Sequence, residues 1–191
     1  MGETSKIEWT DSTFNPWIGC QHVSPGCDHC YAEAMMDTRL GRVQWGPHGE
    51  RGRTSQSYWK QPRKWNADGL RFERENAHRH RVFCASLSDV FDNQVPKQWR
   101  VDLFTLIRET PNLDWLLLSK RPTNMRTMLP PDWSDGYPNV WLGCTAESAQ
   151  YYRALAGSRG DSGPRAFHVL RTGGRTDRAS LYSRRRSIAT G

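Results

Sequence analysis

The chain has 191 residues and a formal net charge of +7. This length is enough for one domain with a hydrophobic core, and no run approaches the roughly 18 apolar residues that a membrane-spanning helix needs. The excess charge is confined to residues 153–191, which contain nine Arg and two Asp, whereas residues 1–152 contain 18 basic and 18 acidic residues. The body of the chain therefore has no electrostatic signature of a nucleic-acid-binding face.

The beginning of the chain and its cysteines indicate a reducing compartment. Residues 1–6 contain no apolar signal region, so we expect a cytoplasmic protein without a membrane segment. Thiols stay reduced there, and an odd number of cysteines, five, fits a disulfide framework poorly. Cys84 and Cys144 lie inside apolar runs and are expected in the core, which leaves three cysteines for metal binding or catalysis.

The first forty residues predict a strand, a cysteine-rich loop and a helix. Residues 6–10 have the composition of a short strand that leads into the loop. Residues 31–40 are rich in helix formers, and Gly41 is a plausible stop for that helix.

The next segment has no clear period. Residues 42–66 are rich in Gly, Arg, Trp and Pro, so we interpret them as an inserted loop, followed by a short helix near residues 67–78. Tryptophans in this loop are candidates for exposed stacking residues, and two nearby histidines are expected at the surface. These residues are Trp45, Trp59, Trp65, His78 and His80.

Three nearly continuous apolar runs, at residues 82–86, 115–119 and 140–144, predict strands that are buried on both faces. Apolar spacing predicts a helix near residues 96–107 between the first two strands, and a shorter helix near residues 123–129 precedes the third. Strands and helices thus alternate at intervals of about one β-α unit. The pattern predicts an α/β fold with a parallel sheet, either open or barrel-like.

Polar residues follow the carboxyl end of each predicted strand. In parallel α/β folds these loops carry the functional residues. Here they contain the cysteines, Asp89, Lys120 and Glu147, so we expect all of them at one edge of the sheet. The basic pair Lys120-Arg121 suits an anionic group such as a carboxylate or a phosphate, or else forms a solvated turn, and Asp89 could instead cap a helix.

Cys20, Cys27 and Cys30 form the most informative motif of the chain. Three thiolates on one loop can hold a metal ion or a cluster and leave one coordination position open for chemistry. The rival interpretation is a structural zinc site completed by His22 or His29. Structural zinc usually uses two ligand pairs, and the chain has only one closely spaced cysteine pair.

Two stretches around these cysteines match a known pattern: residues 15–20 read Asn-Pro-Trp-Ile-Gly-Cys and residues 27–32 read Cys-Asp-His-Cys-Tyr-Ala. This loop resembles the cluster loop of radical S-adenosylmethionine (SAM) proteins, particularly the spore-photoproduct-lyase-like branch. The gap before the second cysteine is three residues longer than usual. Over residues 5–150 the chain also resembles a phage- and prophage-associated three-cysteine family, through stretches such as Lys-Ile-Glu-Trp-Thr, Val-Phe-Cys-Ala-Ser-Leu and Asp-Trp-Leu-Leu-Leu.

The resemblance implies an incomplete radical SAM (β/α)6 partial barrel over residues 1–152. It implies a [4Fe–4S] cluster on the three cysteines, SAM on the open iron, and reductive cleavage of SAM for radical chemistry on an unknown substrate, such as a nucleic acid. An electron donor such as flavodoxin or ferredoxin would be a partner. The implied SAM-binding residues are Tyr31, Ser86, Ser88 and Ser119, and the implied catalytic residues are Asp89 and Lys120.

Residues 153–191 break the α/β pattern, because Arg, Gly, Ala and Ser occupy 25 of these 39 positions. Three interpretations are open: a disordered basic arm, a shifted reading frame, or a nucleic-acid-binding tail. We expect few buried side chains there, and hence an exposed sheet edge beside the last predicted strand. The alternatives to the radical SAM function are a zinc-stabilised, non-catalytic phage accessory or nucleic-acid-binding protein, and an inactive fragment.

Overall fold

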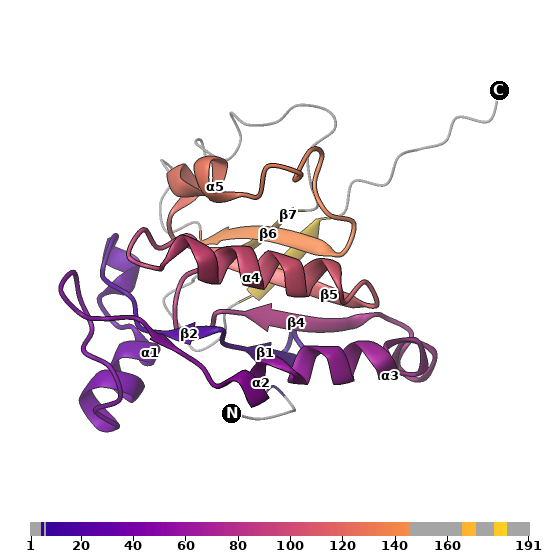
Figure 1. Ribbon diagram of the computed structural model, residues 1–191, viewed down its shortest axis with the longest axis horizontal. Coiled ribbons are helices and arrows are strands. Elements are labelled where there is room, and N and C mark those ends of the chain that lie inside the picture. The colour runs from indigo at the N-terminus through magenta and orange to yellow at the C-terminus, as the bar shows by residue number, and fades with distance from the viewer. Residues whose placement is uncertain (1–4, 6, 146–165, 171–177, 183–191) are drawn as a thin grey trace.

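A six-stranded sheet forms the frame of the molecule in the computed structural model, which describes residues 5, 7–145, 166–170 and 178–182. Its strand order is β1-β4-β5-β6-β7-β8 (Figure 1). The strands are β1 (Ser12–Phe14), β4 (His80–Cys84), β5 (Leu113–Ser119), β6 (Val140–Thr145), β7 (Ala166–Leu170) and β8 (Arg178–Tyr182). Neighbours from β1 to β7 are parallel, and β8 runs antiparallel to β7.

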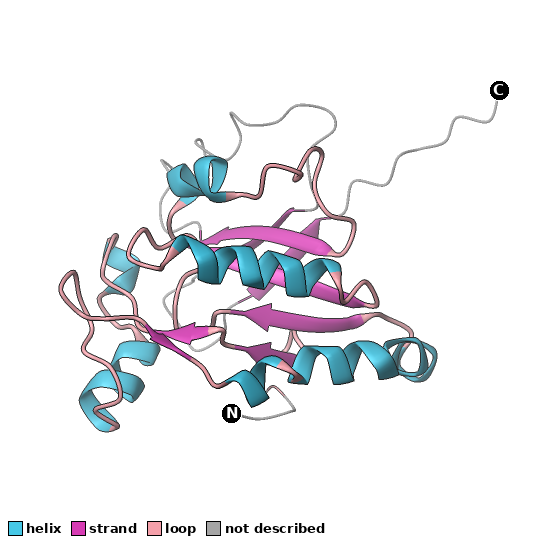
Figure 2. Ribbon diagram, viewed as in Figure 1, coloured by secondary structure: helices cyan, strands magenta, loops and turns pink. Residues whose placement is uncertain are grey.

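The sheet is wound in one direction, because its strand order follows the chain order. Right-handed crossovers that always step the same way leave their helices on one face of a sheet. Figure 1 shows α3 and α4 crossing in front of the strands, and Figure 2 shows the separate helical and strand layers. The helices between the strands of this sheet are α2 (Gln56–Trp59), α3 (Gln61–Asn76), α4 (Lys97–Arg108) and α5 (Pro122–Met128). Within the described strands no pairing joins β8 to β1, so these strands form no closed barrel.

The main core fills the space between the sheet and the helices. Strand residues Phe14, Trp115 and Leu117 are fully buried there against α4 residues Leu103 and Ile107. The opposite face of the sheet carries a smaller apolar cluster, built from Trp9 and Leu116 with Phe83, Leu118 and Trp141 partly buried around them. Side chains alternate between these two faces along each strand, and the continuous apolar runs of the sequence follow from that burial.

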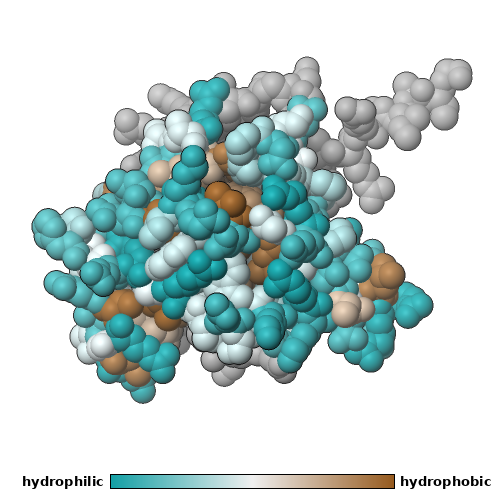
Figure 3. Space-filling model, in the orientation of Figure 1, coloured by the Kyte–Doolittle hydropathy of each residue, from teal (hydrophilic) through white to brown (hydrophobic). Residues whose placement is uncertain are grey.

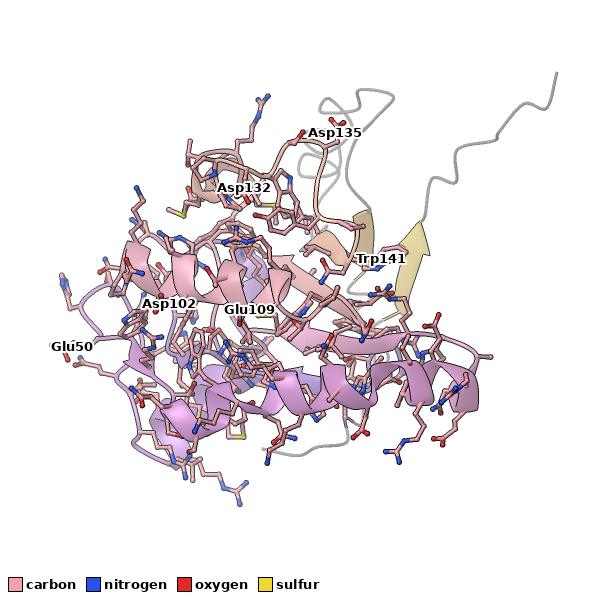
Figure 4. The ribbon with its side chains drawn as sticks, turned by 45° about the vertical axis from the view of Figure 1, so that its right-hand side comes forward. Glu50, Asp102, Glu109, Asp132, Asp135 and Trp141 are labelled. Carbon is pink, nitrogen blue, oxygen red and sulfur yellow. The ribbon has the colours of Figure 1, made fainter. Side chains whose placement is uncertain are left out.

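Ion pairs cover the outer side of α4. Asp102 pairs with Arg53 at 2.7 Å, and Glu109 pairs with Arg63 of α3. Figure 3 shows a mostly hydrophilic surface on this side, and Figure 4 labels Asp102 on α4 and Glu109 directly after it. Exposed pairs of this kind contribute little stability, about 0–1 kcal/mol each, so they mainly keep this face soluble.

The cysteine-rich segment forms a small lobe beside the sheet (Figure 1). Strand β2 (Trp17–Ile18) pairs antiparallel with β3 (Gly52–Arg53) at its base. The lobe continues through a 3-10 turn, η1 (Pro25–Cys27), helix α1 (Tyr31–Glu33) and a π-helical segment, η2 (Ala34–Arg39). Ile18, Ala32, Met36, Trp45 and Leu87 form its own apolar cluster.

The three predicted parallel strands and the two helices between them are confirmed, with boundaries shifted by a few residues. The strand predicted at residues 6–10 is wrong, because β1 begins only at Ser12 and a turn precedes it, closed by the bond from Thr10 N to Ile7 O at 3.1 Å. The inserted loop is also more ordered than expected. It contains β3, α2 and the first part of α3.

The aromatic residues of this insert are not exposed stackers. Trp45, Trp59 and Trp65 are 8%, 9% and 9% exposed, because Trp59 and Trp65 pack into the main core and Trp45 packs into the apolar cluster of the cysteine lobe. His80 is not at the surface either. It is 8% exposed, stacks on Phe72 at 4.4 Å between ring centroids, and contacts the Ser12 hydroxyl at 2.9 Å.

The sheet continues into the segment for which the sequence predicted no strand. β7 pairs with β6 and β8 pairs with β7, so β6 has a neighbour on each side and is not an exposed edge. The other residues after Thr145, including Glu147, lie outside the described part of the chain. Among the described helices, none combines the length and the apolar character needed to cross a membrane.

Candidate active site

A cavity of about 510 Å³ lies at the carboxyl ends of β4 and β5, under the cysteine lobe. This volume is in the range of small-molecule binding sites. The three predicted cysteine ligands, the four implied SAM-binding residues and the two implied catalytic residues all line it. They are Cys20, Cys27, Cys30, Tyr31, Ser86, Ser88, Asp89, Ser119 and Lys120.

The topology explains this convergence. Parallel strands end at the same edge of a sheet, so the loops after β1, β4 and β5 meet there. Backbone contacts join the first two loops, because Gly19 N donates to Leu87 O at 3.1 Å and Gly19 bridges to Ser88. Asn15 reinforces the joint, since its Oδ1 accepts from Leu87 N at 2.7 Å. The cysteine loop is thereby fastened directly to the loop that follows β4.

Gly19 is required at this joint. Its φ of +107° lies in the region that residues with a side chain rarely adopt. A Cβ at this position would also lie 3.2 Å from Arg51 Cδ and 3.3 Å from Glu50 O. The residue directly before Cys20 therefore has both a backbone and a packing reason to be glycine.

The three cysteines are free thiols that face the same cavity. Cys27 is buried and the other two are half-buried, and Cys30 N donates to Cys27 O at 3.2 Å across the turn between them. In the described part of the chain, no three His, Cys, Asp or Glu side chains are gathered closely enough to hold one metal ion. The three thiols thus line the same cavity, but their sulfur atoms do not converge on one point.

A buried carboxylate organises the floor of the cavity. Both oxygens of Asp89 accept from the Ser119 hydroxyl, at 2.8 and 3.0 Å, and Lys120 N donates to Oδ2 at 3.1 Å. Arg121 Nη1 lies 3.0 Å from the same Oδ2, with both side chains about 5–6% exposed. Asp89 is therefore held by the chain itself, which explains why the loop after β4 and the end of β5 stay together.

A second buried pair lies behind the first. Asp92 accepts from Arg51 Nε at 2.8 Å, and its side chain is fully buried. Arg100 Nη1 donates to Asp92 O at 3.0 Å, and Arg121 Nη2 lies 3.8 Å from Asp92 Oδ2. The result is a connected network of three guanidinium groups and two carboxylates beneath the cavity.

Arg121 connects this network to the cysteine loop. Its Nη1 donates to Cys20 Sγ at 3.3 Å and its Nη2 donates to Gln21 O at 3.2 Å. Burial raises the pKa of the Cys20 thiol to about 11, while the nearby Arg121 guanidinium acts to lower it. Burial works against the charge of Arg121, yet Asp89, Cys20 and Asp92 raise its pKa above the ordinary value, so this cation is permanent.

The serine hydroxyls of the cavity differ in their hydrogen bonding. Ser86 exchanges hydrogen bonds with the Asn15 amide at 3.1 and 3.2 Å, and Ser119 is bound to Asp89. Ser88 Oγ, by contrast, is a buried atom with no hydrogen-bond partner among the described residues. Tyr31 is 58% exposed at the cavity wall. Ser88 is therefore the hydroxyl that a bound ligand could satisfy.

The candidate zinc ligands separate. His29 lines the cavity together with the three cysteines. His22 instead contacts Glu33, with 2.6 Å between Nε2 and Oε2. Of the two histidines considered from sequence, only His29 thus shares the wall of the cysteines.

Sequence reasoning missed the buried ion pairs. Arg51 and Asp92 were not singled out as a pair, and the basic pair after β5 was expected to suit an anionic group in general. The structure shows that the anion beside Arg121 is the chain's own Asp89. The signal available was a charged residue after each of two neighbouring strands, which is typical of groups that meet at one sheet edge.

Comparison with known proteins places the chain in a family. Residues 4–156 match the family described as "Protein of unknown function (DUF5131)". The match covers most of the chain, so the protein belongs to this family. No curated protein and no solved structure matches the chain.

Proposed function

We propose that this protein is an iron–sulfur enzyme of the radical SAM type, with a [4Fe–4S] cluster held by Cys20, Cys27 and Cys30. The observation that supports the proposal most is their shared cavity at the carboxyl ends of the strands. Three thiolates hold such a cluster and leave one iron open for a ligand. The one-directional winding of the sheet supports the partial barrel implied by the sequence resemblance.

The residues present fit the group in the chemistry of their donor atoms. All three thiols are unoxidised and reach the cavity. Cys27 and Cys30 lie on a loop with mostly exposed neighbours, including His22, Val23 and Asp28. This loop thus supplies two of the three thiolates that such a cluster needs.

When bound and reduced, the cluster would supply the electron that cleaves SAM to a 5′-deoxyadenosyl radical. The chain supplies the surroundings for that chemistry. Trp9, Phe83 and Leu118 form an apolar wall of the cavity. Ser88 offers a hydroxyl and Tyr31 an aromatic ring for the ligand, and Ser86 and Ser119 shape the same wall through their bonds to the chain.

The two residues proposed as catalytic take different roles. Lys120 adds a positive charge to the cavity wall, where an anionic group of SAM or of the substrate would bind. The bonds that Asp89 accepts from Ser119, Lys120 and Phe91 commit its carboxylate to the architecture of the site. We therefore propose Asp89 as a positioning residue rather than as a proton-transfer group.

The proposal extends to the biological setting. We propose a reducing, cytoplasmic compartment and a reduced flavodoxin or ferredoxin as electron donor. The proposal assigns no single substrate class, and nucleic acids are among the candidates. The phage- and prophage-associated resemblance motivates the last element. Residues 1–152 have balanced charge, so nucleic-acid recognition by this region would depend on the cavity rather than on a basic face.

Anaerobic reconstitution with iron and sulfide tests the proposal. We expect a brown protein with broad visible absorbance, and SAM cleaved to 5′-deoxyadenosine and methionine after reduction. Single Ala substitutions of Cys20, Cys27 or Cys30 should abolish iron binding. Cys144→Ala is the matched control, because that thiol is buried in β6 and does not line the cavity.

The same experiment decides between the proposal and its rival. A colourless protein that holds zinc, and loses it on His29→Ala, would support a zinc-stabilised binding module. The presence of His29 beside the three cysteines is the observation that favours this second candidate. Retention of iron by Cys20→Ala, with loss of iron from the Cys144→Ala control, would show that the ligand assignment is wrong.

A further inference from the structure

We infer that Arg121 is the positioning residue of the cysteine site. Its direct N–H···S hydrogen bond holds Cys20 in place and tunes the reduction potential of the cluster that binds there. The inference deepens the proposed function and rests on it, because it takes Cys20 as a ligand. Arg121 precedes α5 and is remote in sequence from the cysteine loop. Its role follows from contacts that only the folded chain creates.

Arg121 joins the cysteine loop and the loop after β4 to the end of β5. It reaches Cys20 Sγ at 3.3 Å and Gln21 O at 3.2 Å in the cysteine loop, and Asp89 Oδ2 at 3.0 Å in the loop after β4. Its own backbone N donates to Ser119 Oγ at 2.9 Å at the end of β5. Since the side chain is only 5% exposed, it has little freedom to leave this position.

The charges of the network point to the same role. Arg51, Arg100 and Arg121 carry three positive charges, whereas Asp89 and Asp92 carry two negative charges. Buried charge is costly unless it is balanced. The member of this network that reaches the cysteine loop is Arg121, whose Nη1 contacts both Cys20 Sγ and Asp89 Oδ2. The buried charges therefore fix the guanidinium that donates to the sulfur.

The choice of arginine follows from the geometry. A planar guanidinium presents several donors in a fixed fork, so one side chain can bind a sulfur, a carbonyl and a carboxylate at the same time. A lysine ammonium at the same place would keep the charge but lose this fixed arrangement. Hydrogen bonds to the sulfurs of an iron–sulfur cluster are among the factors that set its reduction potential. Arg121 would raise that potential, because the bond stabilises the added negative charge.

Two variants of Arg121 and a matched control test the inference. Arg121→Met removes the charge and the donors, and Arg121→Lys keeps the charge alone. Arg126→Met is the control, because Arg126 is an exposed arginine on the neighbouring α5. The measurements are the midpoint potential of the reconstituted cluster without SAM, and amide hydrogen exchange of residues 19–22 in the metal-free protein.

We expect both Arg121 variants to shift the midpoint potential to more negative values, and the exchange of residues 19–22 to become roughly tenfold faster in Arg121→Met. Arg126→Met should match the unmodified protein in both measurements. If Arg121→Met fails to fold, Arg121→Lys decides, and an unchanged potential with unchanged exchange in that variant would overturn the inference.

The exchange measurement separates this inference from the proposed function. If the unmodified protein takes up no iron, the proposed function fails, while faster exchange of residues 19–22 in the Arg121 variants would still establish Arg121 as the anchor of Cys20. If iron is bound but neither the potential nor the exchange responds to Arg121, the proposed function stands and the positioning role is overturned.

Discussion

The thiol of Cys20 lies at the point where the cysteine loop meets the buried charges of the sheet edge. Its sulfur accepts a hydrogen bond from Arg121, and the cavity wall encloses it on the other side. Burial and the guanidinium act on its proton in opposite directions, and burial is the larger effect. This balance can be measured without any metal.

Alkylation of Cys20 in the metal-free protein should show the raised pKa of about 11. Only the thiolate reacts, and below its pKa the thiolate fraction grows tenfold for each pH unit. We therefore expect the rate of modification by iodoacetamide to keep rising from about pH 8 to pH 10, measured by peptide mass spectrometry. A plateau of the Cys20 rate near its ordinary pKa of 9.0 would contradict this expectation.

Asp89→Asn should destabilise the protein by about 3 kcal/mol, because it leaves the buried Arg121 without its close partner. Urea unfolding measures the loss. Glu109→Gln is the matched control, since it makes the same change in an ion pair whose side chains are about half exposed, and it should cost less than about 1 kcal/mol. Equal effects of the two substitutions would mean that the buried network does not support the fold.

At the scale of elements, helix α3 closely approaches the turn before β5. Gly69 of α3 faces Asn112, and a Cβ there would lie 2.7 Å from Asn112 Cβ and 3.1 Å from Asn112 O. Asn112 cannot easily retreat, because its N donates to Asn66 Oδ1 at 2.8 Å and its Nδ2 donates to Asn66 O at 3.1 Å. The helix is thereby clamped to the turn.

Gly69→Ala should therefore destabilise the protein, although alanine favours a helix over glycine by about 1 kcal/mol. Overpacking typically costs about 1–3 kcal/mol, and the fixed position of Asn112 keeps the cost toward the upper part of that range. Thermal unfolding measures the sign. Asp68→Ala, at an exposed position of the same helix, should be nearly neutral. A stabilised Gly69→Ala protein would show that the turn can move.

At the scale of the whole molecule, β7 and β8 decide whether the sheet ends at β6. Removing residues 153–191 deletes both strands and leaves the β6 backbone without one of its two neighbours. We expect faster amide exchange in β6 and concentration-dependent association of the shortened chain, because an unpaired edge strand templates pairing with other chains. Size-exclusion chromatography and hydrogen exchange measure the two effects.

A chain shortened after residue 182 is the control, because it keeps β7 and β8. It should behave as the full chain in both measurements. If the two shortened chains are indistinguishable, the last two strands do not contribute to the sheet in solution. The interpretation of residues 153–191 as an arm without strands would then stand.

Local pattern in the sequence was enough to predict β4, β5 and β6, the helices between them and the meeting of the cysteines with Asp89 and Lys120. Continuous apolar runs report burial on both faces, and parallel strands must end at one edge, so the loops after them converge. The boundaries of α3, the burial of Trp59 and the pairing of β7 were not predictable in this way. They depend on contacts with distant residues, which leave no period in the chain.

The buried charge network shows this difference most clearly. Arg51 and Asp92 are 41 positions apart, and Arg121 and Cys20 are 101 positions apart. Each of these residues, read alone, resembles a solvated surface charge or a lone thiol. The sequence by itself determined which residue types reach the edge of the sheet. Only the tertiary structure decided their partners, because removal from water makes every charge require a counter-charge within a few ångströms.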